Sequence, residues 1–316
     1  MFDALPNFWT PVMAAADLAD KPVGMVLAGE KIVLFRGKDG PAALLDRCPH
    51  RGVALSLGRI AEGQLECPFH GWKFDGKGHC SHIPFNPGLE RAGVGALPAR
   101  ELGGLIWVYT GFEATEEPVV PPALLDKRFH LDVLTEEWSA HWTRAMENML
   151  DTPHLPWVHR GTIGSSLWKR MRPDSKMNQE VTETDWGFED RFQIDDGEGN
   201  QINWRRPNGM ELFILEKPWG RMRTHAWCVP TTTDHTRMIV ATATGFGWLN
   251  VFAGLGRGFN RRVLGEDRAV LESSFPVRVP APDDEQNVPT DKVTLRFRMW
   301  YLKNLAEREP PAATPG

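Results

Sequence analysis

Two short loops, each with one cysteine and one histidine, constrain this chain more than any other feature of its sequence. The first reads CPH at residues 48–50, the second reads CPFH at residues 67–70, and residues 51–66 separate them. Two cysteines and two histidines can bind Zn²⁺, or an iron–sulfur cluster in which imidazoles replace two of the thiolates. Neutral imidazole leaves less negative charge on its iron than thiolate does, which raises the reduction potential. The pattern therefore predicts a metal site near the start of the chain.

A second group of possible ligands lies in the segment 147–159, which reads ENMLDTPHLPWVH. His154 and His159 would point roughly 140° apart around a regular α-helix, too far apart to share one ion. Pro153 and Pro156 remove backbone donors and disrupt such a helix. A helix distorted in this way can turn both imidazoles toward one point.

Both groups of residues resemble the pattern of the Rieske-type non-haem iron oxygenases. The loops match the family's Cys-x-His and Cys-x-x-His motifs, the proline after each cysteine, and the Gly-Trp pair after the second histidine. The segment 147–159 resembles the family's motif for a mononuclear iron, in which an aspartate precedes two histidines that are five residues apart. The resemblance runs from about Phe8 to Tyr301. It is greatest to the monooxygenase and O-demethylase branch and to the pheophorbide oxygenase-like branch.

The resemblance assigns a role to each ligand of the two loops. Cys48 and Cys67 are expected to bind one iron of a [2Fe–2S] cluster, and His50 and His70 are expected to bind the other. A structural zinc ion is the alternative for the same four ligands. A colourless protein without iron and sulfide would favour zinc.

The same resemblance names the residues of the second site. His154 and His159 are expected to bind a mononuclear Fe(II) ion. Asp151 corresponds to the family's bridging aspartate, which hydrogen-bonds a ligand histidine on each side. Asn148 corresponds to a residue near the iron. The alternative is that both histidines are ordinary core residues.

A third ligand of this iron must come from elsewhere in the chain. Two imidazoles and one carboxylate form the facial triad of non-haem Fe(II) oxygenases and leave the opposite positions open. The resemblance favours Asp267, in an acidic helix start that continues with an apolar pair and a glutamate. Glu266 and Glu272 are the alternatives. Asp267 could otherwise be a helix charge that the dipole favours.

The remaining patterns predict an α+β chain with two domains. Residues 1–110 alternate short apolar runs with glycine-rich turns, which is typical of a small all-β domain. Residues 111–122 are acidic and proline-rich and are interpreted as a linker. Residues 123–305 are expected to form a helix-grip-like catalytic domain with an antiparallel sheet, and residues 306–316 a disordered tail.

Apolar patterns and prolines also predict the elements of the second domain. They are a strand at 129–142, a helix at 143–159 broken by its prolines, extended runs at 211–215, 238–243 and 292–301, and a helix at 262–273. The walls of a substrate pocket are expected among residues 200–250 and in a helix at 248–259. His225 is a candidate lining residue.

Charge and termini exclude several partners. The net charge of −5 argues against nucleic acid or an anionic membrane. The start of the chain lacks the cationic and apolar regions of a signal peptide, and no apolar run approaches the roughly 20 residues needed to span a bilayer. We therefore expect a cytoplasmic protein whose four cysteines are ligands or core residues.

The resemblance implies an enzyme that uses O2 to hydroxylate or oxidatively demethylate an apolar or aromatic small molecule. The sequence shows no dinucleotide fingerprint, so a separate NAD(P)H-dependent reductase, with or without a ferredoxin, is expected to supply electrons. In the family, the cluster of one subunit faces the catalytic iron of its neighbour, which implies a homotrimer. The alternatives are a Rieske-type desaturase or oxidative cyclase, an electron carrier without oxygenase activity, and a zinc-stabilised binding protein.

Overall fold

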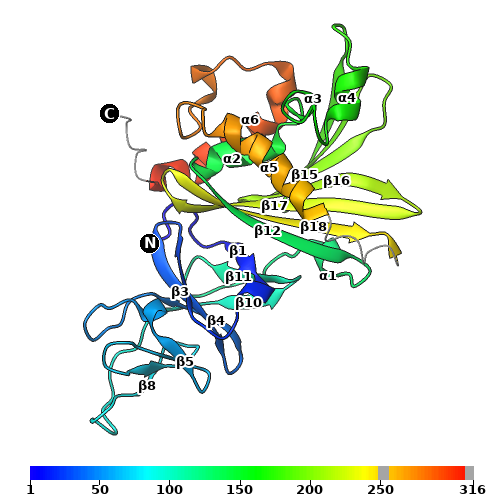
Figure 1. The fold of residues 1–316 in the computed structure, drawn as a ribbon. Helices are drawn as coiled ribbons and strands as arrows, with labels where there is room; N and C mark the ends of the chain where they lie inside the picture. The colour runs from blue at the N-terminus through cyan, green and yellow to red at the C-terminus, as the bar shows by residue number, and fades with distance from the viewer. Residues whose placement is uncertain (248–255, 310–316) are drawn as a thin grey trace. The chain divides into compact units, whose positions relative to one another are not determined.

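A computed structural model describes residues 1–247 and 256–309, which form two compact units, Met1–Leu125 and Asp126–Gly316 (Figure 1). The first unit is built from small β-sheets, whereas the second combines one large sheet with helices. This composition confirms the expected α+β class. No helix among the described residues is both long enough and apolar enough to cross a membrane.

Three small antiparallel sheets build the first unit. Their strand orders are β1-β11-β10, β2-β3-β4-β9 and β5-β6-β7-β8. The strands are β1 (Trp9–Ala14), β2 (Val23–Leu27), β3 (Glu30–Gly37), β4 (Gly40–Leu45), β5 (Arg59–Ala61), β6 (Gln64–Glu66), β7 (Lys73–Phe74), β8 (Cys80–His82), β9 (Ala96–Leu97), β10 (Ala99–Leu102) and β11 (Leu105–Tyr109). Cys48 and Cys67 belong to one buried cluster with Leu44, Leu65 and Phe74, so both cysteine–histidine loops start from the core.

The segment that the sequence suggests as a linker contacts the first unit. Trp9 Nε1 donates a hydrogen bond to the carbonyl of Glu116 at 2.6 Å. Arg100 makes two hydrogen bonds, of 2.8 and 2.7 Å, to the carboxylate of Glu117. The short helix α1 (Pro122–Leu125) follows, and the boundary between the two units comes directly after it.

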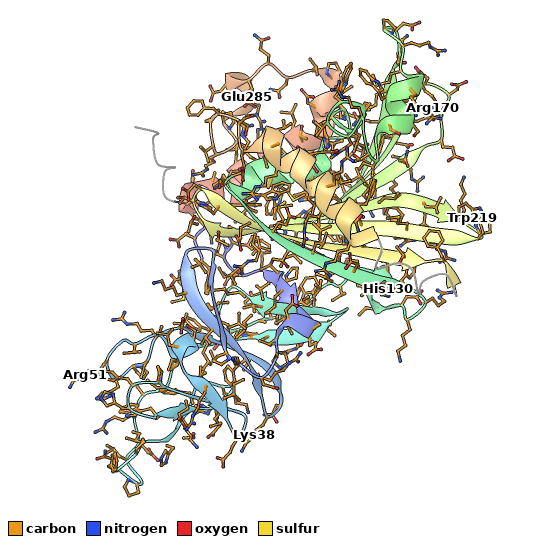
Figure 2. The ribbon with its side chains drawn as sticks, in the orientation of Figure 1. Lys38, Arg51, His130, Arg170, Trp219 and Glu285 are labelled. Carbon is orange, nitrogen blue, oxygen red and sulfur yellow. The ribbon has the colours of Figure 1, made fainter. Side chains whose placement is uncertain are left out.

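A seven-stranded antiparallel sheet is the framework of the second unit, in the order β12-β18-β17-β16-β15-β14-β13. Its strands are β12 (His130–Trp138), β13 (Met177–Thr184), β14 (Gly187–Ile194), β15 (Asn200–Arg205), β16 (Gly209–Lys217), β17 (Gly220–Thr232) and β18 (His235–Gly245). Figure 2 shows Trp219 at the tip of the hairpin between β16 and β17. The register places Ile202, Leu212, Thr224 and Thr242 opposite one another in four neighbouring strands, so their side chains share one face.

Helices cover one face of this sheet (Figure 1). They are α2 (Trp142–Leu150), α3 (Leu155–Val158), α4 (Ser165–Arg170), α5 (Arg257–Leu271) and α6 (Lys292–Asn304). Trp142, Ala145, Met146 and Met149 recur with the helical period in α2 and are all buried, which explains why this helix packs as it does.

Several predicted elements are confirmed. The strand predicted at 129–142 is confirmed for residues 130–138, which form β12, whereas Trp142 already belongs to α2. The helix predicted at 262–273 lies in α5 up to Leu271, and the extended runs at 211–215 and 238–243 lie in β16 and β18. The predicted helix at 143–159 is broken as expected, into α2 and the single turn α3. Residues 248–255 of the predicted helix at 248–259 lie outside the described residues.

The prediction of extended structure at 292–301 is wrong, because this segment is the helix α6. Its apolar residues alternate with period two, which is typical of a strand. Val293, Phe297 and Tyr301 also share one helical face, and these three are the buried ones. Met299 fits only the strand pattern and is 58% exposed. The sequence thus fits both the period of a strand and the period of a helix, and packing against the rest of the unit selects the helix.

The prediction of a disordered tail from residue 306 is wrong for its first four residues. Ala306–Arg308 form a 3-10 helix, and the carboxylate of Glu309 is buried. Glu309 accepts hydrogen bonds from Trp142 Nε1 at 2.9 Å and from Tyr301 Oη at 3.0 Å, and its Oε2 lies 2.8 Å from His141 Nε2. Composition alone gave no sign of this network. Residues 310–316 lie outside the described residues.

Candidate metal centres

The two cysteine–histidine loops of the first unit share one backbone design. The backbone N of Cys48 donates to the carbonyl of Val53 at 2.8 Å, and Gly52 N donates to the carbonyl of Cys48 at 2.8 Å. Cys67 N makes the equivalent bond to the carbonyl five residues later at 2.8 Å, and Gly71 N donates to the carbonyl of Cys67 at 3.1 Å. Both glycines have a positive φ, +73° and +67°, which explains the glycine in each motif.

These loops bring two thiols and two imidazoles together. Cys48 and Cys67 are buried, whereas His70 is exposed and His50 is partly exposed. The Nδ1 atoms of the two histidines are 3.2 Å apart, and the ring of His50 stacks on the Trp72 indole with an interplanar angle of 5°. Burial raises the pKa of the Cys48 thiol to about 11. Two sulfur and two nitrogen donors so placed fit the ligand set of a Rieske cluster.

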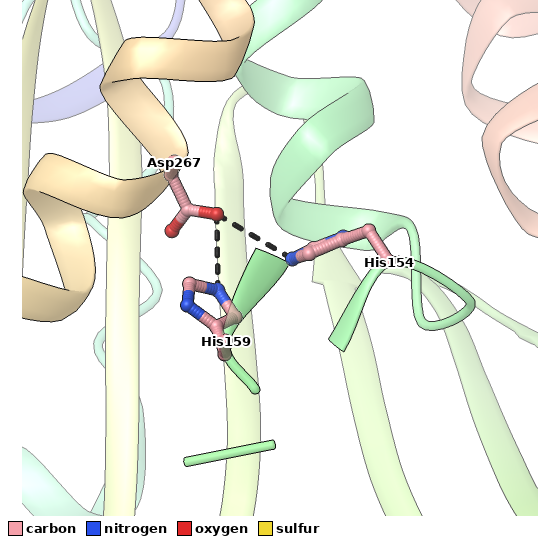
Figure 3. Close-up of side chains that lie close together, drawn as sticks. All are labelled: His154, His159 and Asp267. Atoms are coloured by element: carbon pink, nitrogen blue, oxygen red, sulfur yellow. Dashed lines mark ion pairs between the residues drawn. The ribbon is translucent and has the colours of Figure 1, made fainter. Parts of the chain in front are cut away.

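In the second unit, the break between α2 and α3 gives the two histidines of the motif a common direction. His154 precedes the single turn α3 and His159 follows it. Their Nε2 atoms lie 3.4 and 3.0 Å from Oδ1 of Asp267, which projects from α5 (Figure 3). One ligand atom from each of the three residues lies within 4.8 Å of the others. The structure thus brings together the three residues that the resemblance singled out.

The three side chains are arranged as ligands of a shared cation and not as hydrogen-bond partners of one another. Asp267 Oδ1 is buried and has no hydrogen-bond partner among the described residues, although both imidazoles are near it. Burial by itself lowers the pKa of His154, but the charges of Asp151 and Asp267 outweigh it and raise the pKa to about 9. Burial by itself raises the pKa of Asp267, but the two imidazoles outweigh this effect and lower the pKa from 3.8 to about 2. A cation at this position would take the place of the proton that the carboxylates attract.

Asp151 and Asn148 lie beside the triad. Asp151 Oδ2 is 3.7 Å from His154 Nδ1, which is beyond hydrogen-bonding distance. Asn148 Nδ2 is buried and has no hydrogen-bond partner among the described residues. Both side chains line the cavity at the triad and also a second cavity, on the side of Arg144 and Arg298. They therefore separate the triad from that second cavity.

The two alternative carboxylates do not join the triad. Glu266 Oε2 lies 2.9 Å from Nδ1 of His159, on the opposite edge of the ring from Asp267. Glu272 accepts hydrogen bonds from the backbone N of Ser139 and from Arg268.

A cavity of about 200 Å³ opens beside the triad, between the sheet and α5. Its apolar walls include Ile202, Met210, Leu212, Ile214, Met222, Val240 and Leu264. The expectation that strand residues 200–250 supply the walls is confirmed.

Asn260 also lines the cavity, and its Nδ2 donates to Thr242 Oγ1 at 3.2 Å. Thr224 and Ala226 line the cavity but His225 does not, because successive strand residues point to opposite faces.

Comparisons with known families decide what this chain is. Residues 8–93 match the model of the Rieske [2Fe-2S] domain, and residues 138–308 match the model of the vanillate O-demethylase oxygenase C-terminal domain. The chain belongs to the Rieske-type non-haem iron oxygenases. This Rieske-type oxygenase accordingly has a [2Fe–2S] cluster and a mononuclear iron as cofactors.

Relatives of this Rieske-type oxygenase act on different molecules. It is 31% identical over 321 residues to chlorophyllide a oxygenase of Chlamydomonas reinhardtii. The alignment covers 94% of this chain but only 48% of the relative. The chain thus spans about half the length of that relative. It is 28% identical over 327 residues to methylxanthine N1-demethylase of Pseudomonas putida. That alignment covers 96% of this chain and 90% of the relative.

Solved structures share the fold of this Rieske-type oxygenase. Dicamba monooxygenase bound to 3,6-dichlorosalicylic acid aligns with a TM-score of 0.80 and 23% identity over 96% of this chain and 97% of that chain. Pseudomonas putida CBB5 NdmA with caffeine aligns with a TM-score of 0.80 and 25% identity over 93% and 89%.

Sequence reasoning did not single out the polar pair Asn260 and Thr242 of this Rieske-type oxygenase. One signal was present: Asn260 precedes Asp267 by seven residues, which is two helical turns, so both share one face of α5.

Proposed function

We propose that this chain is the terminal oxygenase of a multicomponent system and that it hydroxylates or oxidatively demethylates a small apolar or aromatic molecule. The observation that carries the proposal is the convergence of two imidazoles and one carboxylate beside an apolar cavity. When bound, the cluster supplies single electrons and the mononuclear iron activates O2.

The four ligands of the loops are assigned as the sequence suggests. Cys48 and Cys67 would hold one iron of the cluster, and His50 and His70 would hold the other. The burial of the two thiols supports this assignment, because it keeps sulfur ligands away from water. The more exposed imidazoles leave one edge of the site accessible to a redox partner.

His154, His159 and Asp267 are the proposed ligands of the mononuclear iron. The low pKa of Asp267 keeps its carboxylate ionised at neutral pH, as a ligand must be. His159 is 1% exposed, and Asp267 is 4% exposed, so these side chains exclude bulk water from their side of the site.

The cavity favours an uncharged substrate. No lysine or arginine is found among its described lining residues, and an anion buried without a partner costs several kcal/mol. Asn260 and Thr242 can hydrogen-bond a carbonyl, ether or hydroxyl group of such a substrate.

The size of the cavity favours a substrate with one or two rings. A dry cavity of about 150 Å³ accommodates benzene, and the cavity beside the triad is about 200 Å³. Asn260 lies about 10 Å from Asp267 along the axis of α5. A substrate whose polar group hydrogen-bonds Asn260 would therefore present its reacting carbon to the triad. That carbon would be separated from the polar group by about one ring.

Asp151 and a homotrimer belong to the same proposal. The side chain of Asp151 is 36% exposed, next to a His154 side chain that is 14% exposed. That exposure leaves it free to meet a ligand histidine of a neighbouring subunit's cluster, which is the arrangement that the family resemblance implies. The cytoplasmic location stays a prediction from the sequence.

The test measures O2 uptake and products with a surrogate reductase. The panel contains uncharged methoxylated aromatics, N-methylated heterocycles, phenols and terpenoids, with benzoates as the charged comparison. We expect uptake coupled to a hydroxylated or demethylated product of an uncharged one- or two-ring compound, and none in His154→Ala. Products that include neither an ¹⁸O-labelled hydroxyl group nor formaldehyde from a lost methyl group would support a desaturase or cyclase instead. Iron-replete protein that consumes no O2 with any compound would contradict the proposal.

A further inference from the structure

The buried ring of His159 is held at both of its nitrogens. Nε2 lies 3.0 Å from Asp267 Oδ1, and Nδ1 lies 2.9 Å from Glu266 Oε2. The two carboxylates are neighbours in α5, where successive residues point about 100° apart. They therefore reach opposite edges of one imidazole. Asp267 lines the cavity, whereas Glu266 is not among its lining residues.

Glu266 is itself fixed by two further contacts. Thr162 Oγ1 donates a hydrogen bond to the same Oε2 atom at 2.6 Å. Arg262 Nε, one turn earlier in α5, lies 3.4 Å from the other carboxylate oxygen. Thr162 follows His159 closely in the chain, so Glu266 ties α5 to the segment that carries the imidazole. A carboxylate held at both oxygens restricts the rotation of that ring.

His154 has no equivalent support. Its Nδ1 atom is buried, lies 3.7 Å from the nearest Asp151 oxygen, and has no hydrogen-bond partner among the described residues. The Asp151 side chain is 36% exposed, compared with 21% for Glu266. One imidazole of the triad is therefore fixed from behind and the other is not.

We propose that Glu266 is the positioning residue of the mononuclear iron site. Its carboxylate accepts the hydrogen bond of His159 Nδ1–H, which selects one tautomer and leaves the Nε2 lone pair facing Asp267. The inference rests on the proposed function in one respect, namely that the triad binds an ion. It gives Glu266 a role that differs from the ligand role considered for it in the sequence.

Co²⁺ is the probe that tests the proposal. Full-length protein with an intact cluster, whose mononuclear site has been emptied with a chelator, is titrated with Co²⁺. Orienting partners of ligand histidines typically contribute 10- to 100-fold to metal affinity. Glu266→Ala is expected to weaken Co²⁺ binding roughly 10- to 100-fold and to alter the visible spectrum of the bound ion. Glu266→Gln is expected to recover most of the affinity, because its amide oxygen still accepts from Nδ1–H.

Glu272→Ala is the matched control. It removes a carboxylate at the end of the same helix, from a side chain that is 28% exposed and bonded to Arg268 and Ser139. Its Co²⁺ affinity is expected to equal that of the wild type. Equal affinities in Glu266→Ala and the wild type would overturn the proposal, and so would equal losses in Glu266→Ala and Glu272→Ala.

Two further outcomes are decisive. If Glu266→Ala does not fold, Thr162→Val removes one hydrogen bond to Glu266 and is expected to weaken Co²⁺ binding several-fold. Wild-type affinity in that variant would overturn the proposal. Wild-type protein that binds no more Co²⁺ than Asp267→Ala would instead refute the triad as a metal site, and with it the proposed function.

Discussion

Asp267 Oδ1 lies 3.0 Å from Nε2 of His159, yet no hydrogen bond joins them. The carboxylate comes from α5 and the imidazole follows α3, so the fold of the second unit brings them together. A contact that served stability alone would direct an N–H group at the carboxylate. Two electron-pair donors that face one another in a buried position are instead typical of the ligands of a shared cation.

Asp151→Asn is expected to leave both metal centres bound and to slow turnover roughly 10- to 100-fold. The substitution keeps the size of the side chain but removes the charge beside His154, where the nearest oxygen and nitrogen are 3.7 Å apart. Iron content, cluster absorbance and product formation are measured together. Asp174→Asn changes an exposed aspartate in the same way and serves as the control. Wild-type turnover in Asp151→Asn would remove this residue from the mechanism.

Asn260→Ala is expected to raise KM about fivefold with little change in kcat. A hydrogen bond to the substrate that persists in the transition state contributes equally to both states, at about 1 kcal/mol. Arg261→Ala alters the next residue of α5, whose side chain is 65% exposed, and should leave KM unchanged. A fall in kcat at constant KM would show that Asn260 does not act as a substrate anchor.

Asp190→Asn is expected to stabilise the protein at neutral pH. Burial raises the pKa of Asp190 from 3.8 to about 6, and its Oδ1 atom has no hydrogen-bond partner among the described residues. A raised pKa means that the folded state holds the proton more tightly. This tighter proton binding adds to the free energy of unfolding. The contribution is fully present below pH 3.8 and is lost as the pH rises through about 6.

Denaturant titrations at two pH values check this linkage. The stability of Asp190→Asn relative to the wild type should increase by about 2 kcal/mol between pH 4.5 and pH 7.5. Asp185→Asn, in the exposed turn before β14, is the control. A stability difference that is the same at both pH values would contradict the assignment.

Glu309→Ala is expected to destabilise the second unit by roughly 3 kcal/mol or more. Removal of the carboxylate leaves the buried donors of Trp142 and Tyr301 without their partner. Glu307→Ala removes an exposed carboxylate from the same segment and should change the free energy of unfolding by less than about 0.5 kcal/mol. Thermal unfolding followed by circular dichroism compares the two, and equal midpoints would show that the tail is not anchored by Glu309.

The sequence predicted best what depends on neighbouring residues. Each cysteine–histidine loop is closed by its own backbone hydrogen bonds and by a glycine with positive φ, so its spacing alone carries the information. The prolines around His154 likewise predicted the broken helix. In contrast, no local signal tells which of the three acidic residues Glu266, Asp267 and Glu272 faces the triad. The rotation of α5 about its axis decides that, and long-range packing sets this rotation.

The second unit shows the same limit. The segment 292–301 allows both a strand and a helical period, and burial of Phe297 and Tyr301 selects the helix. The role of Glu309 depends on Tyr301 of α6 and on His141 and Trp142, and the latter two lie 168 and 167 residues away in the sequence. Neither result follows from composition or local propensity.

Iron and sulfide content tests the central claim most directly. Anaerobically reconstituted full-length protein should contain about three irons and two sulfides per chain, two irons in the cluster and one at the triad. Asp267→Ala and His154→Ala should each lose about one iron and keep the paramagnetic signal of the reduced cluster. Two irons per chain in the wild type, unchanged in both variants, would contradict the account.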